Sequence, residues 1–179
     1  MLLSRLCVVA ALLLSSPAWA KIEGLYGSDC LQVDGLSAVK DFLFENSRFE
    51  MVQTVFGDTA CDGAVYDFSF SGPYVFDQVS SGLDLTFSNV RLTALDSRIV
   101  DAFNAVALCG ITDWELEIPV EVSGLACGGQ TIPGRDSRIY DIIREVEGGV
   151  QMGLPEDLRN GSSPSKRPEA FDDLIYKAK

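Results

Sequence analysis

The feature that most constrains this chain is the alternation of apolar and polar residues along several short segments. Between residues 66 and 76, aromatic residues share one parity on both sides of Gly72-Pro73; they are Tyr66, Phe68, Phe70, Tyr74 and Phe76. Successive side chains of a β-strand point to opposite faces, so this pattern predicts a strand with one buried face. A chain with many such segments has to fold as packed or closed β-structure.

The strictest alternation runs from residue 114 to residue 122, between Cys109 and Cys127. Its apolar positions are Trp114, Leu116, Ile118, Val120 and Val122, and glutamates and a proline fill the positions between them. The segment is predicted to form a strand with one dry and one solvent-facing side. Pro119 has no backbone N–H to offer a neighbouring strand, so we expect an edge, a bulge or an irregularity there.

Turn-forming residues separate the remaining apolar segments. The predicted strands besides 114–122 are 22–30, 39–45, 49–56, 66–76, 83–92 with a bulge near Asn89, 139–146 and 150–154. Two hairpins are expected, around the turn at 45–48 and around the glycine pair at 148–149. Residues 31–37 and 155–168 are predicted to be loops, and 170–176 a terminal segment that docks.

One segment has helical rather than strand periodicity. Ile99, Phe103 and Val106 recur at intervals of four and three residues, and Gly110 follows them. Asp96 or Ser97 could cap the start, so a short helix within residues 96–108 is predicted. About eight strands with one short helix indicate an antiparallel sandwich or barrel. We favour an eight-stranded barrel, because closure removes exposed strand edges.

The first twenty residues have the pattern of a secretory signal peptide. Arg5 precedes an apolar run at 6–14, and Ala18-Trp19-Ala20 places small residues before Lys21. We therefore expect one mature domain over residues 21–179, with 155–168 as its surface loop, in the periplasm or secreted. No comparably long apolar segment follows, so the mature chain is not expected to span a membrane.

The acidic composition excludes some classes of partner. The chain has 26 acidic and 14 basic residues, a net charge of -12. Nucleic acids and anionic membrane surfaces both require a positive face, and neither is expected to bind.

Cys30, Cys61, Cys109 and Cys127 lie beyond the predicted signal peptide. An even number in an exported chain predicts two disulfides with three alternative pairings. We favour the sequential pairs, which staple neighbouring elements. With no C-x-x-C motif and no histidine, we expect neither a metal site nor a cofactor.

Candidate catalytic residues are scarce. The absence of histidine excludes Ser-His-Asp and Cys-His nucleophilic sites, and no G-x-S-x-G or phosphate-binding glycine loop is present. The acid pairs Asp58 with Asp62 and Asp172 with Asp173 leave a carboxylate-based enzyme as a third hypothesis. We expect the protein not to be an enzyme.

Aromatic side chains give the stronger functional hypothesis. The candidate pocket residues are Phe42, Phe44, Phe68, Phe70, Tyr74, Phe87, Trp114, Leu116 and Tyr140. They fill an ordinary core, or some of them line a pocket for a small hydrophobic or amphipathic ligand. In the second case Tyr140 or Gln53 could orient a head group. The alternative function is a filled barrel that acts as an envelope protein-interaction or inhibitor module.

Spaced motifs in the chain resemble those of a known family. They are Gly24-Leu25-Tyr26 with Cys30, F-G-D-T-A-C at 56–61, S-G-P-Y at 71–74, C-G-x-x-D-W at 109–114, and Arg167-Pro168 followed by Tyr176. This pattern resembles the adenomatosis-polyposis-coli-down-regulated domain, and bacterial proteins of similar pattern share the last two motifs. The resemblance implies a secreted lipocalin-like barrel with an apolar, lipid-accepting cavity. Tyr26 replaces the family's tryptophan, and one domain is present instead of two, so the Wnt inhibition of the animal members is not carried over.

Overall fold

Eight antiparallel strands close into a barrel in the computed structural model, which describes residues 21–33 and 35–179. Each strand pairs with the next, and the last pairs with the first. In spatial order they are β1 (Gly24–Gly27), β3 (Leu36–Glu45), β4 (Arg48–Phe56), β5 (Ala64–Asp77), β6 (Gly82–Thr86), β11 (Arg138–Val146), β12 (Gly149–Gly153) and β13 (Phe171–Ala178). The predicted eight-stranded barrel is confirmed, whereas the predicted signal peptide lies outside the described residues.

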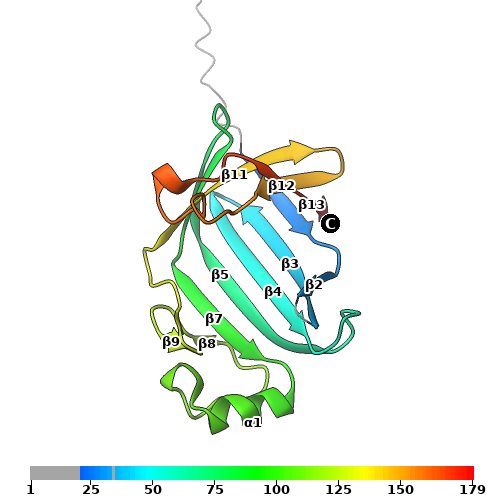
Figure 1. The fold of residues 1–179 in the computed structure, drawn as a ribbon, viewed down its shortest axis with the longest axis vertical. Coiled ribbons are helices and arrows are strands. Elements are labelled where there is room, and N and C mark those ends of the chain that lie inside the picture. The colour runs from blue at the N-terminus through cyan, green and yellow to red at the C-terminus, as the bar shows by residue number, and fades with distance from the viewer. Residues whose placement is uncertain (1–20, 34) are drawn as a thin grey trace, which may run out of the picture.

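Part of the sheet continues beyond the closed barrel. Strand β5 pairs with β6 through residues 74–77 and with β7 (Asn89–Ala94) through residues 66–71. Strand β8 (Val120–Glu121) adds to β7 and forms an edge. Figure 1 shows β3, β4, β5 and β7 running from the closed end toward helix α1 (Ser97–Ala105).

Gly72 lies where β5 exchanges one partner strand for the other. A Cβ atom on Gly72 would lie 1.8 Å from the carbonyl oxygen of Thr86, so only glycine permits this approach. The Ser88 N–H donates to the Ser71 carbonyl at 2.7 Å across the same junction. The bulge predicted near Asn89 thus lies at the same junction, opposite Gly72, where β5 changes its partner strand.

Both predicted hairpins are confirmed. Strands β3 and β4 pair continuously from Ser37 with Phe56 to Glu45 with Arg48. Asn46 and Ser47 form their turn with φ of 52° and 60°, the left-handed conformation of a tight hairpin. Strands β11 and β12 are joined by the two-residue turn Glu147-Gly148, in which Gly148 has a φ of 85°.

The long strand predicted at 114–122 is wrong. Only β8 and an isolated bridge between Leu116 and Ala94 form there, and Glu117 has a φ of 60°, which breaks the extended chain. Leu116 and Ile118 are exposed, while Trp114 and Val122 are buried. The irregularity expected at Pro119 is present, since β8 begins only after it at the edge of the sheet.

Smaller elements complete the chain. The predicted helix is confirmed as α1, and the 3₁₀ turn η1 (Leu108–Gly110) follows it. The loop predicted at 31–37 instead contains β2 (Leu31–Val33) and the start of β3. The surface loop at 155–168 holds the 3₁₀ turn η2 (Pro164–Lys166), and β9 (Ala126–Cys127) pairs with β10 (Gln130–Thr131). None of the described helices is long and apolar enough to cross a membrane.

The buried side chains form two clusters. The first fills the closed barrel and is built around Phe44, Leu83, Ile143 and Val150, each no more than 1% exposed. The second lies between β7, β8, α1 and η1 and is centred on Trp114. Phe70 packs against both clusters. The barrel interior is therefore occupied by side chains.

Candidate ligand-binding groove

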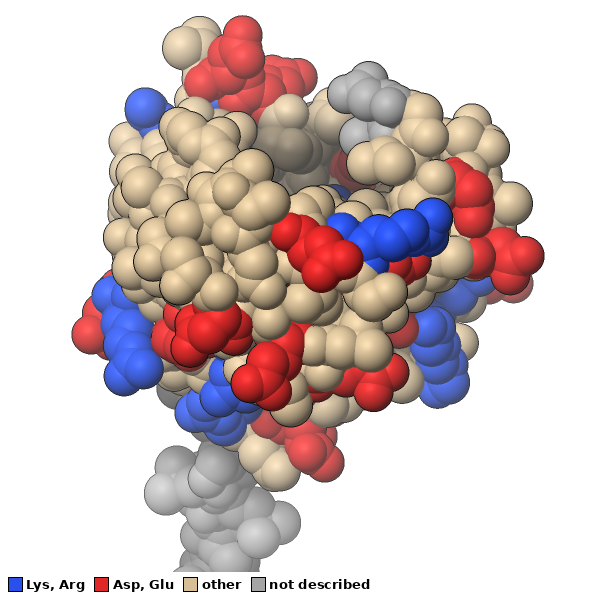
Figure 2. All heavy atoms as spheres, turned by 90° about the horizontal axis from the view of Figure 1, so that it is seen from below, with Lys and Arg blue, Asp and Glu red and all other residues tan. Residues whose placement is uncertain are grey.

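An apolar groove of about 330 Å³ lies between the extended sheet and the α1–η1 segment. Its lining comes from β4, β5, β7, α1 and η1, and consists of Gln53, Tyr66, Phe68, Leu92, Phe103 and Leu108. Figure 2, which looks at the molecule from the α1 end, shows a hollow in this side of the surface. The volume is at the lower end of the range of about 300–1,000 Å³ that small-molecule sites occupy.

The sheet wall of the groove follows from strand register. Gln53 is paired with Phe68, and Phe68 is paired with Leu92, so these three side chains form one row across β4, β5 and β7. Directly paired residues in antiparallel strands hold their Cβ atoms about 4.5–5.5 Å apart on one face. Tyr66 belongs to the neighbouring row, in which it pairs with Val55 and Ala94.

The helical wall is fixed by Trp114 and Asn104. The Asn104 amide donates to the Trp114 carbonyl at 3.1 Å, and its oxygen accepts from the Trp114 N–H at 2.8 Å. The Trp114 indole N–H donates to the Leu108 carbonyl at 3.4 Å. The Phe103 ring meets the indole edge to face, with centroids 5.2 Å apart. Asp96 caps the start of α1 by accepting from the Arg98 N–H at 2.7 Å.

The Cys109–Cys127 disulfide joins η1 to β9 behind this wall. It closes a chain of 18 residues that includes the whole irregular segment 114–122. The crosslink therefore restrains Leu108 and, through Trp114, the position of Phe103.

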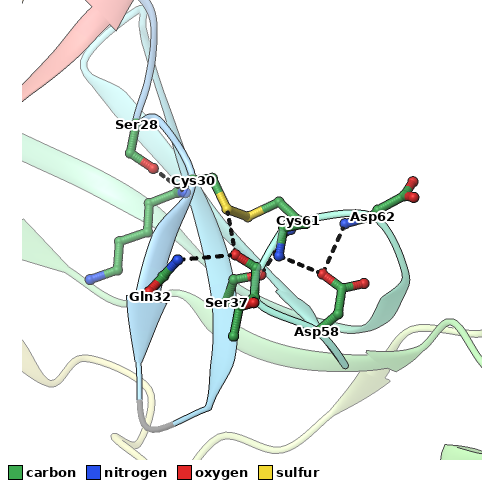
Figure 3. The surroundings of a disulfide bond; sticks show 10 residues. Ser28, Cys30, Gln32, Ser37, Asp58, Cys61 and Asp62 are labelled. Carbon is green, nitrogen blue, oxygen red and sulfur yellow. Dashed lines mark hydrogen bonds between the residues drawn. A yellow bond between two sulfur atoms is a disulfide. The ribbon is translucent and has the colours of Figure 1, made fainter.

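The Cys30–Cys61 disulfide lies beside the start of β3 and the end of β4, at the ends of these strands opposite their hairpin turn (Figure 3). Beside it the buried Ser37 hydroxyl accepts from the Cys61 N–H at 3.0 Å. The Asp58 carboxylate accepts from the N–H groups of Ala60 and Asp62, which shapes the turn after β4. Asp58 thus has a structural role in this turn. Both disulfides have the sequential pairing that was favoured.

Four predicted pocket residues lie in the filled part of the barrel. Phe42, Phe44, Tyr74 and Phe87 are each no more than 7% exposed. The rings of Phe44 and Tyr74 meet edge to face at 5.2 Å, and the Tyr74 hydroxyl donates to the Ile22 carbonyl. These residues belong to the barrel core and not to the groove.

The other predicted residues are distributed around the molecule. Phe68 lines the groove, Phe70 packs edge to face against it at 4.6 Å, and Trp114 supports the helical wall. Leu116 is 47% exposed outside the groove. Tyr140 lies on the barrel, and the Arg167 guanidinium carbon is 5.6 Å from the centroid of the Tyr140 ring. Gln53, considered for head-group binding, is part of the lining, whereas Tyr140 is not.

Sequence reasoning missed Tyr66, Leu92, Phe103 and Leu108 as lining residues. Tyr66 shares its parity with Phe68, so the alternation contained a signal for it. Phe103 had been placed on the predicted helix, but no local pattern shows that this helix covers the end of the sheet. That information is carried by long-range pairing.

A polar cluster around Arg167 holds the 155–168 loop against the barrel. Arg167 donates to the Asp84 carboxylate and to the carbonyl oxygens of Leu83 and Asp141. The Asp141 carboxylate accepts from the N–H groups of Ile142 and Gly153, yet burial raises its pKa to about 6. Arg167 links three elements that are distant in sequence, so this centre serves the closure of the barrel.

No protein-family model matches the chain, and no curated protein is significantly similar to it.

Proposed function

We propose that the protein is a binding protein for a small hydrophobic or amphipathic molecule, which it holds in the groove between α1 and the extended sheet. The observation that carries this proposal is the composition of the lining. Three aromatic rings and two leucines surround a solvent-accessible space, and a single amide is the most polar side chain among them. Binding sites for small apolar ligands have this character.

The packing of the closed barrel and of the helical wall supports the same proposal. The closed half of the barrel is filled, so it supplies a rigid support on which the groove is built. The helical wall is fixed by a disulfide and by paired hydrogen bonds to Trp114. A preformed wall reduces the entropy lost when a ligand binds. Two disulfides also suit the oxidising compartment in which we place the protein, the periplasm or the exterior.

The test is saturable binding of a neutral dye whose fluorescence rises in apolar surroundings, such as N-phenyl-1-naphthylamine. We expect Phe103→Ser to weaken dye binding at least about tenfold, because about 1.4 kcal/mol of contact energy corresponds to that factor. Phe171→Ser is the matched control, since Phe171 is also half-buried but lies under Arg144 on the barrel. Dye binding that is absent, or that both variants weaken equally, would contradict the proposal.

A second candidate function is protein interaction through the outside of the filled barrel. The β5–β6 hairpin projects from the closed end (Figure 1), and it carries Val75 near the end of β5 and Val79 in the turn, which are 66% and 97% exposed. These two exposed valines are the observation that favours this candidate, because contact with a partner would remove their apolar surface from water. Crosslinking in the source envelope, followed by purification, would recover a partner with the natural chain and not with Val79→Ser. Failure to recover any partner would count against it.

A further inference from the structure

We propose that the groove selects small amphiphiles with a carboxylate head, and that Lys40 binds this carboxylate while the apolar tail lies on Phe68, Leu92 and Phe103. This inference rests on the proposed function and names the ligand class of the same groove.

Lys40 continues the row of side chains that forms the sheet wall. It is paired with Gln53, Gln53 with Phe68, and Phe68 with Leu92. The register of β3 and β4 is unbroken from Ser37 to Glu45. Lys40 therefore has the parity of Phe42 and Phe44, which point into the barrel core. The row leads from a cation through an amide to the apolar part of the groove.

This cation has no neighbour of opposite charge on the same face. The inward positions of β3, β4, β5 and β7 that share the parity of the core residues are otherwise uncharged. Within residues 21–33 and 35–179, Lys21, Lys177 and Lys179 form ion pairs with Glu23, Asp29 and Asp41, but Lys40 forms none. Its backbone is held by Ser28, whose hydroxyl accepts from the Lys40 N–H at 2.9 Å.

Two further polar groups belong to the groove, and one of them, Gln53, is the direct cross-strand neighbour of Lys40. The Gln53 amide and the Tyr66 hydroxyl are the polar side-chain groups of the groove lining. An amide N–H and a hydroxyl can each donate to a carboxylate oxygen. A bound carboxylate would therefore meet an ammonium group and two neutral donors at one end of an apolar surface.

The charge of the protein favours a singly charged head. The chain has a net charge of -12, so a phosphate dianion would meet more repulsion than a carboxylate. Phosphate sites also recruit several arginines or backbone N–H groups, whereas this end of the groove offers one lysine. A cationic head would be repelled by Lys40 itself.

The experiment is competition against the neutral dye by decanoate, decanol, decylamine and decyl phosphate, which share one tail. We expect decanoate to compete about tenfold more strongly than decanol, as for a charge-assisted hydrogen bond. Lys40→Met should abolish this preference, and Lys40→Arg should retain it. Lys166→Met is the matched control and should leave it unchanged, because Lys166 lies exposed in η2 on the barrel side.

The outcomes separate the two proposals. If no dye binds to the natural protein, the proposed function itself fails. If dye binds but decanoate and decanol compete equally, or the preference survives in folded Lys40→Met, the carboxylate inference is overturned and the groove stands. Stronger competition by decyl phosphate or decylamine than by decanoate would also overturn it.

A second measurement keeps the inference testable if the Lys40 variants fail to fold. Reductive methylation of the natural protein with ¹³C-formaldehyde places an NMR-visible methyl pair on each lysine. Decanoate should shift the signal of Lys40 and leave that of Lys166 in place, and the opposite result would overturn the assignment.

Discussion

Phe103 of helix α1 meets the indole of Trp114 edge to face, with ring centroids 5.2 Å apart and an interplanar angle of 67°. Trp114 is 2% exposed, whereas Phe103 is half-buried and presents its other side to the groove. Trp114 thus supports the helical wall of the groove, and Phe103 forms the surface of this wall.

This division of roles predicts different effects for two truncations. Trp114→Ala should lower the free energy of unfolding by about 3–5 kcal/mol, because it leaves a large cavity beneath the helix. Phe103→Ala should cost about 1–2 kcal/mol, since less of its surface is buried. Urea titration followed by circular dichroism measures both values. An equal loss for the two variants would contradict the proposed arrangement.

The disulfides should differ in their effect on the groove. Replacing both cysteines of either pair by serine should lower the free energy of unfolding by about 3 kcal/mol, because each closes a loop of moderate length. We expect removal of Cys109–Cys127 to weaken dye binding as well, because it fastens the helical wall. The Cys30–Cys61 double variant is its control. Weaker binding in the control alone would show that this reasoning is wrong.

Asp141 should make stability depend on pH. Burial raises its pKa to about 6 from an ordinary value of 3.8, so the folded state holds this proton more tightly than the unfolded chain does. The contribution of Asp141 to the free energy of unfolding is therefore fully present below about pH 4 and is lost as the pH rises through about 6.

Asp141→Asn should remove this dependence and stabilise the protein at pH 7 by about 1–3 kcal/mol. The amide oxygen can still accept from the Ile142 and Gly153 N–H groups. Thermal unfolding of both proteins between pH 4 and pH 7 measures the effect. Parallel pH profiles for the two proteins would contradict the shifted pKa.

Gly72→Ala should be among the most damaging small substitutions. Its methyl group would lie 1.8 Å from the Thr86 carbonyl oxygen, so the junction of β5, β6 and β7 would have to separate. We expect a loss of about 3 kcal/mol or more, the upper end for overpacking. Gly134→Ala is the control, because the nearest atom to its new methyl group is 3.8 Å away. Chemical denaturation compares the two, and a tolerated Gly72→Ala would mean that the strand exchange does not depend on this contact.

Local pattern alone determined most of the barrel strands of this protein. Side-chain alternation has a period of two residues in any strand. The segments around Phe42, Phe68 and Leu85 can therefore be recognised as strands without knowledge of the strands they pair with. The same reasoning found the helix that carries Phe103. It failed at 114–122, because Trp114 and Val122 are buried by contacts with the helix and β7 rather than by a continuous strand.

Only the tertiary structure decided which apolar residues fill the core and which line the groove. Phe68 and Tyr74 have the same parity on one strand, yet Tyr74 is enclosed by the barrel and Phe68 is open to the groove. The difference arises at Gly72, where β5 exchanges β6 for β7 as its partner. Strand pairing joins residues that are distant in the chain, and a pattern of neighbours cannot specify that choice.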